Sequence, residues 1–340
     1  MKKTVRFILL FSLILVLFAA WKVFGPSVSI PEEKFLYIRT GSTFGQVKED
    51  LISKKIISSA RWFDWVASAM KFNTVKAGKY EIKKSMSLFD LIRVLKNGRQ
   101  TPVKLVITKL RLKEDFARKL GQQFEFDSLA AIQFLTNNDS LRDFGVDSNT
   151  VMAVVMPDTY SFFWNSSPEK VYQKLFDHWK AFWNDERKKK AGMIQLTPIQ
   201  VSTLASIVDE EVNLKTEKEK IASVYLNRLH QNMEMQSCPT VKYALRDFAL
   251  TRLYYKHLKV ESPYNTYENR GLPPGPICTP QPETIDIVLN APQTDYLYFV
   301  ANSDFSGTHI YTSNYADHLK FAKKFAEAQD KQDSIRKANH

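Results

Sequence analysis

The stretch TPIQVSTLASIVDEEV, residues 197–212, organises the larger half of this chain. Thr197 followed by Pro198 is a typical helix start, because threonine caps free backbone N–H groups and proline fits the first turn. Val201, Leu204 and Val208 then recur at helical spacing and form an apolar stripe. The sequence therefore predicts a helix that turns one face to a core and ends near residue 212.

Acidic residues end this predicted helix and point in different directions. Glu211 lies seven residues after Leu204 and three after Val208, so at about 100° per residue it returns to the apolar stripe. Asp209 lies at the edge of that stripe and Glu210 points away. Burial and the negative end of the helix dipole both raise the pKa of such a carboxyl group, which suits it to general acid catalysis. A carboxylate that pairs with a lysine or arginine at the rim is the alternative that spacing alone favours.

A loop-rich segment follows over residues 236–282. Within it, SPYNTY (262–267) and GLPPG (271–275) combine aromatic rings, amides, hydroxyls and rigid turns. Sugars bind to such groups, because rings offer flat stacking faces and fixed polar groups match hydroxyls. An ordinary loop with proline and glycine at its turns is the alternative. The aromatic content favours a binding site.

The N-terminus has the pattern of a membrane anchor. Lys2, Lys3 and Arg6 precede an uncharged run from Phe7 to Trp21. Lys22 closes the run, yet it can snorkel, and the two apolar residues after it bring the length close to the roughly 20 residues that a span needs. A cleaved signal peptide is the alternative, but bulky residues flank the small pair at 19–20. We expect an uncleaved anchor over residues 7–24, with residues 1–6 in the cytoplasm and the rest exported.

Composition narrows the chemistry. The net charge is +12 and the basic residues are spread along the chain, so we expect no nucleic-acid partner but a basic surface with affinity for acidic cell wall or lipid head groups. No phosphate-binding loop, dinucleotide fingerprint, zinc-protease motif or serine-hydrolase elbow is present, and two cysteines are too few for a zinc site, so no metal or cofactor is expected.

Cys238 and Cys278 can pair in an oxidising compartment or remain free thiols, and we favour the pair.

The remaining pattern predicts an α+β chain. Strands are expected at residues 35–38, 77–82, 103–107, 296–301 and 309–312. Helices are expected after the capping segments GST (41–43), SS (58–59) and SMS (85–87), over most of residues 113–191 with a break at 156–160, from a capping box at Thr216, and from residue 313 or 314 onward. The charged tail is expected to fray.

Seven segments together resemble the signatures of the YceG-like family, the membrane-bound endolytic murein transglycosylases. They are MPDTY (156–160), LASIVDEE (204–211), ASVYLNRL (222–229), QSCPTVKY (236–243), SPYNTY (262–267), GLPPGPI (271–277) and YLYFV (296–300). Each is weak alone, and their joint order and spacing carry the resemblance, which is strongest from residue 204 to 314.

The resemblance implies an α+β fold with a transmembrane helix (7–24), a linker (25–34), a small LysM-like module (35–100), a catalytic domain (101–330) and a tail (331–340). Its catalytic glutamate aligns with Glu211, the residue that the periodicity selects independently. Substrate-binding positions are expected at Asp158, Tyr160, Gln236, Thr240, Tyr243, Tyr264, Asn265, Thr266, Tyr267, Pro274 and Asn314. Three positions depart from the family: Cys238 where members often carry aspartate, Cys278 where alanine or serine is frequent, and Val212 where many have threonine.

The implied reaction cleaves the β-1,4 bond between N-acetylmuramic acid and N-acetylglucosamine and leaves 1,6-anhydro ends. Glu211 would serve as acid and then as base, while Asp158 and Asp209 are expected to be structural. The family further implies a place in the inner membrane facing the periplasm, glycan strands as substrate, and peptidoglycan synthases as partners. Two alternatives stay open: a muramidase that uses water, and a wall-binding tether without catalysis.

Overall fold

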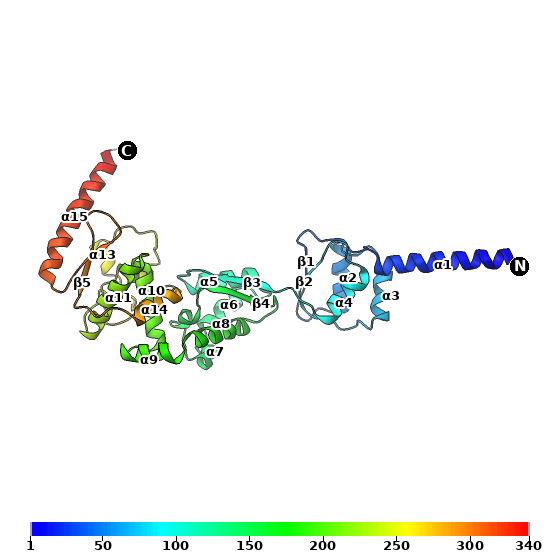
Figure 1. The fold of residues 1–340 in the computed structure, drawn as a ribbon, viewed down its shortest axis with the longest axis horizontal. Helices are drawn as coiled ribbons and strands as arrows, with labels where there is room; N and C mark the ends of the chain where they lie inside the picture. Colours follow the sequence, from blue (N-terminus) through cyan, green and yellow to red (C-terminus); the bar gives the residue numbers. More distant parts are fainter. Residues whose placement is uncertain (1, 339–340) are drawn as a thin grey trace. The chain divides into compact units, whose positions relative to one another are not determined.

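The structure is a computed structural model that describes residues 2–338. The chain forms two compact units (Figure 1). Of the described residues, the N-terminal unit contains 2–105, 120–127 and 160–167, and the C-terminal unit contains 106–119, 128–159 and 168–338.

Helix α1 (Lys2–Phe24) carries the predicted anchor. Within residues 2–338, this is the single helix that is by itself long and apolar enough to cross a membrane, and its apolar side chains are exposed along most of its length. Its last turn differs, because Val23 is buried in the core of the N-terminal unit. Pro26 and Val28 form bridges to Ser87 and Ile57, so the segment expected to be a linker is partly joined to the module that follows.

The rest of the N-terminal module is a β-α-α-β-α unit. Its elements are β1 (Phe35–Ile38), α2 (Phe44–Ser53), α3 (Ala60–Ala69), β2 (Gly78–Glu81) and α4 (Leu88–Asn97). The strands pair antiparallel, with Leu36 opposite Tyr80, and both of these side chains are fully buried. Local chemistry sets the boundaries as predicted: Thr43 caps α2 in a capping box, Ser87 caps α4, and Gly98 ends α4 at a φ of 65°.

Two strands and five helices lead to the main core. Strand β3 (Val103–Ile107) forms a two-stranded sheet with β4 (Asp158–Phe162), where the sequence predicted a break. Pro157 disfavours helix at the residue before it, which suits the entry into a strand. The helices are α5 (Lys113–Gln123), α6 (Ser128–Thr136), α7 (Asn138–Leu141), α8 (Pro168–Phe182) and α9 (Asp185–Met193), with 3₁₀ turns at 142–144 and 151–154.

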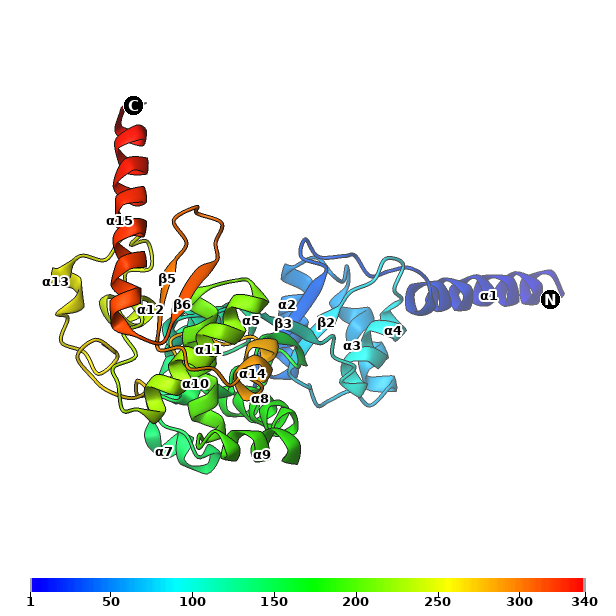
Figure 2. The ribbon, with the colours of Figure 1, turned by 60° about the vertical axis from the view of Figure 1, so that its left-hand side comes forward.

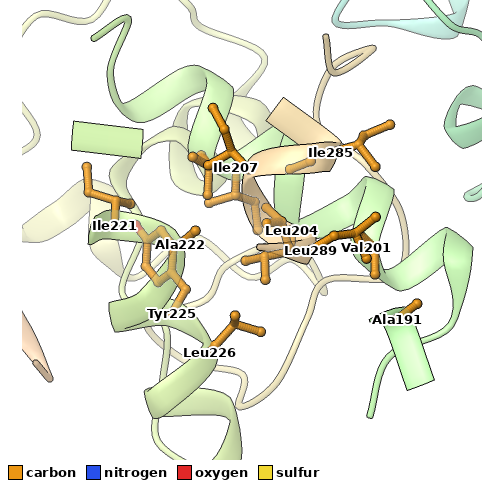
Figure 3. Packing of buried hydrophobic residues seen from close by; sticks show 14 of the residues in the cluster. Ala191, Val201, Leu204, Ile207, Ile221, Ala222, Tyr225, Leu226, Ile285 and Leu289 are labelled. Atoms are coloured by element: carbon orange, nitrogen blue, oxygen red, sulfur yellow. The ribbon is translucent and has the colours of Figure 1, made fainter. Parts of the chain in front are cut away.

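The main core is built around α10 (Pro198–Glu211), which contacts α11 (Lys215–His230) and α14 (Pro282–Leu289). Leu204 of α10 is fully buried between apolar side chains of both neighbours (Figure 3). The predicted Thr197 capping box is present. The predicted cap of α11 at Thr216 is wrong by two residues, since the observed cap is Leu214, whose carbonyl accepts the first backbone hydrogen bonds, and α11 begins at Lys215.

The remaining elements lie around this helical core. Helices α12 (Cys238–Leu245) and α13 (Tyr255–Leu258) interrupt the loop-rich segment. The hairpin of β5 (Tyr298–Ala301) and β6 (His309–Thr312) is confirmed, and β5 contacts α11 and α15 (Tyr315–Ala338) (Figure 2). The tail expected to fray from residue 331 instead continues as helix to Ala338.

Candidate active site

The Glu211 carboxyl group stands at the C-terminal end of α10. Its Oε1 accepts a 2.6 Å hydrogen bond from the Tyr225 hydroxyl of α11 and a 2.8 Å bond from the Ser237 hydroxyl, just before α12. Helix α10 stops there because Val212 adopts an extended conformation. Within residues 2–338, Oε2 has no hydrogen-bond partner, so one oxygen is held by the protein and the other is available.

Burial dominates the electrostatics of Glu211. It raises the pKa of the carboxyl group, and the hydrogen bonds from the Tyr225 and Ser237 hydroxyls lower it only in part. The net result is a pKa above the ordinary range for glutamate. A carboxyl group that keeps its proton closer to neutral pH, with one free oxygen, can act as a general acid.

The two donors to Glu211 are themselves fixed. Tyr225 is fully buried, and burial, with the charge of Glu211, keeps its pKa well above the usual value, so it remains a donor. Ser237 is also buried, and its backbone N–H donates to the Thr266 hydroxyl at 3.0 Å. The Thr240 hydroxyl donates to the Ser237 carbonyl at 2.7 Å and lies 2.8 Å from the Thr266 hydroxyl. Two predicted binding residues, Thr240 and Thr266, therefore hold the Ser237 loop.

The two acidic residues that precede Glu211 form ion pairs with basic side chains. Asp209 is 3% exposed, and its carboxylate pairs with Lys218 and accepts 2.7 Å bonds from the Thr284 hydroxyl and the Gln281 N–H. Glu210 forms ion pairs with Lys109 and Arg111. These contacts fit the structural role expected of Asp209.

Other predicted binding residues line the same loop region. Gln236 donates its backbone N–H to the Thr266 carbonyl, and its side chain is exposed. Asn265 is fully buried, and its amide donates to the carbonyls at 258 and 260, so it braces the loop. The rings of Tyr243 and Tyr264 lie 4.7 Å apart at their centroids, and the Tyr267 hydroxyl lies 3.3 Å from the Cys238 sulfur.

Four predicted binding residues have other surroundings. Asp158 lies 3.5 Å from the His178 imidazole, and Tyr160 is buried in the N-terminal unit. Pro274 is exposed and lines a separate cavity of about 670 Å³. Asn314 caps α15 by accepting the Asp317 N–H at 2.9 Å.

The sequence did not single out the partners of Glu211. Tyr225 lies in the signature 222–229 and Ser237 in the signature 236–243, so the resemblance pointed to their segments. Tyr225 reaches Glu211 because α11 packs on α10, and the periodicity of neither helix predicts that packing.

The expected disulfide is absent, since Cys238 and Cys278 are both free. Cys238 is exposed at the start of α12 beside Tyr267, whereas Cys278 is fully buried and its thiol points to the Ser206 carbonyl of α10 at 3.5 Å. The two thiols thus have different neighbours, Tyr267 for Cys238 and Ser206 of α10 for Cys278.

We expect a thiol reagent to label one cysteine of the native protein and two after denaturation. Cys238 is exposed and therefore accessible to the reagent, whereas Cys278 is buried in the core. Partial desolvation raises the pKa of the Cys238 thiol, so its labelling should be slow. A Cys238→Ser variant should lose the native labelling. Absence of labelling in denatured, unreduced protein would instead establish a disulfide.

Comparisons with known proteins find a family model and curated relatives that match most of this chain. The sequence model of the YceG-like family matches residues 36–324. The chain is 26% identical over 333 residues to a protein of Bacillus subtilis (strain 168) named endolytic murein transglycosylase, covering 91% of each. It is 30% identical over 327 residues to a protein of the same name from Streptococcus pneumoniae, covering 86% of this chain and 57% of that one.

A solved structure has the same fold. The crystal structure of a yceG-like protein from Listeria monocytogenes matches with a TM-score of 0.56 and 26% sequence identity. The match covers 84% of this chain and 98% of that chain.

Proposed function

Because this chain belongs to the YceG-like family, we propose that it is a membrane-anchored endolytic murein transglycosylase with Glu211 as its catalytic acid. Its substrate is the glycan strand of peptidoglycan. The observation that carries the assignment of Glu211 is its carboxyl group, buried enough to have a raised pKa and held through one oxygen by Tyr225 and Ser237.

The proposed reaction begins with proton transfer from Glu211 to the glycosidic oxygen between N-acetylmuramic acid and N-acetylglucosamine. As the C1–O4 bond breaks, the muramoyl C6 hydroxyl attacks C1 and closes a 1,6-anhydro ring, and its proton leaves. A hydrolase of this bond usually needs two carboxyl groups roughly 5 to 10 Å apart. An attacking hydroxyl on the same sugar removes that requirement, because the nucleophile is already in place.

The hydroxyls of Tyr225 and Ser237 support the departure of the proton. Hydrogen bonds to a carboxylate are stronger than those to a neutral carboxyl group, so both donors stabilise Glu211 after it has protonated the leaving oxygen. They also fix the rotamer of the acid, which keeps Oε2 aimed in one direction.

We expect a Tyr225→Phe variant to move the alkaline limb of the rate–pH profile upward by about one pH unit. Glu211 must be protonated to act, so activity falls as the pH rises through its raised pKa. Loss of the Tyr225 donor favours the neutral acid further, because a hydrogen bond to a charged group contributes about 1.5 kcal/mol and one pKa unit corresponds to about 1.4 kcal/mol. The rate of fragment release, measured across pH, locates the alkaline limb, and a variant at an exposed tyrosine, Tyr254→Phe, serves as the control. An unmoved limb would contradict this role for Tyr225.

The location proposed is the inner membrane. Helix α1 would cross it once with residues 1–6 in the cytoplasm, because positive charges precede the apolar run. Both units after α1 would then face the periplasm. Attachment close to the membrane suits cleavage of nascent strands, which would end their elongation, and peptidoglycan synthases are the corresponding partners.

Residues 35–100 are proposed to be a LysM-like module that binds the cell wall. In support, the N-terminal unit has a core of its own and a cavity of about 1030 Å³. The cavity is lined by Tyr37, Arg39 and Lys54 of this module, together with Lys104 and Trp164, which lie outside residues 35–100 in the same unit. Cations and flat rings suit an acidic saccharide.

A Trp164→Ala variant should bind purified peptidoglycan about fivefold more weakly, since loss of a central aromatic contact typically costs more than 1 kcal/mol. Sedimentation with insoluble wall measures this, with the exposed Phe163→Ala as the matched control. Equal binding by Trp164→Ala and wild type would show that this cavity does not bind peptidoglycan.

Incubation of the full-length protein in detergent with purified peptidoglycan tests the proposed function. Soluble oligosaccharides of mixed length are expected, as internal cleavage requires. Disaccharides alone would indicate cutting from strand ends, and wall binding without any soluble product would favour the tether.

A further inference from the structure

A second ordered pair of ionisable side chains lies next to the partners of Glu211. Glu217, on the first turn of α11, is 3% exposed, and its Oε2 accepts hydrogen bonds from the His309 backbone N–H at 2.7 Å and from the Tyr311 hydroxyl at 2.9 Å. The same oxygen lies 3.0 Å from His309 Nδ1. Burial raises the pKa of Glu217, but the bonds from Tyr311 and His309 outweigh it, so the pKa is lowered overall and Glu217 is a carboxylate.

This carboxylate decides the tautomer of His309. A carboxylate only accepts hydrogen bonds, so Nδ1 must carry the proton and donate it, and the lone pair of the neutral imidazole then lies on Nε2. Nε2 has no hydrogen-bond partner within residues 2–338, and 15% of the His309 side chain is exposed. A histidine oriented through Nδ1 by a buried carboxylate, with Nε2 free, is the arrangement of a general base.

His309 stands beside the residues that hold Glu211. The Phe299 ring packs edge-on against Tyr225, with centroids 5.8 Å apart, and edge-on against His309 at 5.5 Å. Tyr225 in turn donates to Glu211 at 2.6 Å. The chain of contacts from Glu211 through Tyr225 and Phe299 to His309 thus joins α10, α11 and the hairpin in one site.

A second group beside Glu211 allows acid and base work to be divided. If Glu211 alone served as acid and base, one carboxyl group would have to give up its proton and take up another during the same bond exchange, while two hydroxyl donors hold its Oε1. A separate base removes that conflict, as in the many sites where two groups divide acid and base work.

We propose that His309, oriented by Glu217, accepts the proton of the attacking hydroxyl, a role that rests on the transglycosylase function proposed above. Glu211 gives its proton to the leaving oxygen as the C1–O4 bond breaks. The C6 oxygen bonds to C1 and its proton passes to His309 Nε2. Solvent then carries this proton from His309 to Glu211, so no proton is consumed over a cycle.

The test compares rate–pH profiles of the full-length wild type with His309→Gln. Proton transfer by a positioned side chain contributes about 10²–10⁴-fold, so kcat should fall at least about 100-fold while KM changes little. Glu211→Gln should be inactive at every pH. The other titratable groups around the pair of Glu217 and His309 are Lys220 of α11, Tyr311 of β6 and Glu211 of α10.

Three further variants separate catalysis from structure. His309→Ala should regain activity when imidazole is added, which a merely structural role would not produce. Glu217→Gln keeps the side-chain shape but loses the charge, and its kcat should fall about tenfold or more. His318→Gln is the matched control, because His318 stacks on Tyr298 of the same hairpin and is expected to change kcat by less than about threefold.

The outcomes are distinguishable. Activity of His309→Gln within about threefold of wild type overturns the proposal while an inactive Glu211→Gln still upholds the transglycosylase. A folded, wall-binding His309→Ala that imidazole does not rescue also overturns it. An inactive wild type would instead overturn the proposed function itself.

Discussion

A Glu211→Gln variant is expected to release glycan fragments at least about 1,000-fold more slowly than the wild type, within the range for loss of a general acid. Glutamine has no proton to give to the leaving oxygen at any pH. Its carbonyl can still accept the hydrogen bonds from Tyr225 and Ser237, so the local structure should survive. Rates of soluble-fragment release by equal amounts of the two proteins measure the effect.

The stability of this variant should not fall. The pKa of Glu211 is raised by burial, so the folded state disfavours its ionised form, and above the unfolded pKa an uncharged amide relieves that cost. Thermal unfolding at neutral pH checks this, and the exposed Glu169→Gln serves as a control for both activity and stability. If Glu211→Gln released fragments at more than about a tenth of the wild-type rate, Glu211 would not be the catalytic acid.

An Asp209→Ala variant should lose about 3–5 kcal/mol of unfolding free energy, the usual cost of removing one partner of a buried ion pair. The Lys218 ammonium, whose side chain is 13% exposed, would remain without its carboxylate. The Thr284 hydroxyl and the Gln281 N–H would lose their acceptor as well, which adds to the cost.

Urea unfolding of full-length protein in detergent measures this loss. The matched control is Asp139→Ala, which breaks an ion pair with Arg142 whose side chains are 83% and 76% exposed, and should cost no more than about 1 kcal/mol. If Asp209→Ala is as stable as that control but loses activity, Asp209 belongs to the chemistry and the structural assignment is wrong.

Glu211 was accessible to sequence reasoning because the Thr197 cap and the spacing of Leu204 and Val208 place it on the same side of one helix as those residues. The expectation of a single buried face is wrong, however, because α11, α12 and α14 all pack on α10 and bury every residue from 201 to 209. The same local rules located the strands β1 and β3 and the caps of α2 and α4.

The start of α11 was missed because a capping-box pattern in the sequence need not form one. Thr216 and Glu219 have the spacing of such a box, yet the helix begins earlier, at Lys215, and its cap Leu214 makes no side-chain hydrogen bond. The contacts of Glu217 with His309 and Tyr311 could not be predicted either, because residues 217 and 309 are far apart in sequence and no periodicity links them.

The disulfide was missed for a similar reason. Spacing along the chain carries no information on whether Cys238 and Cys278 meet, and the first lies on α12 while the second packs on α10.

Mass spectrometry of the fragment ends released from intact glycan strands, by wild type and by Glu211→Gln, decides what this site does. A transglycosylase acting through Glu211 gives wild-type fragments that end in 1,6-anhydro-N-acetylmuramic acid, each lighter by one water than a reducing end, and the variant gives none. Wild-type fragments with hydrated reducing ends, or anhydro ends that persist in Glu211→Gln, would contradict it.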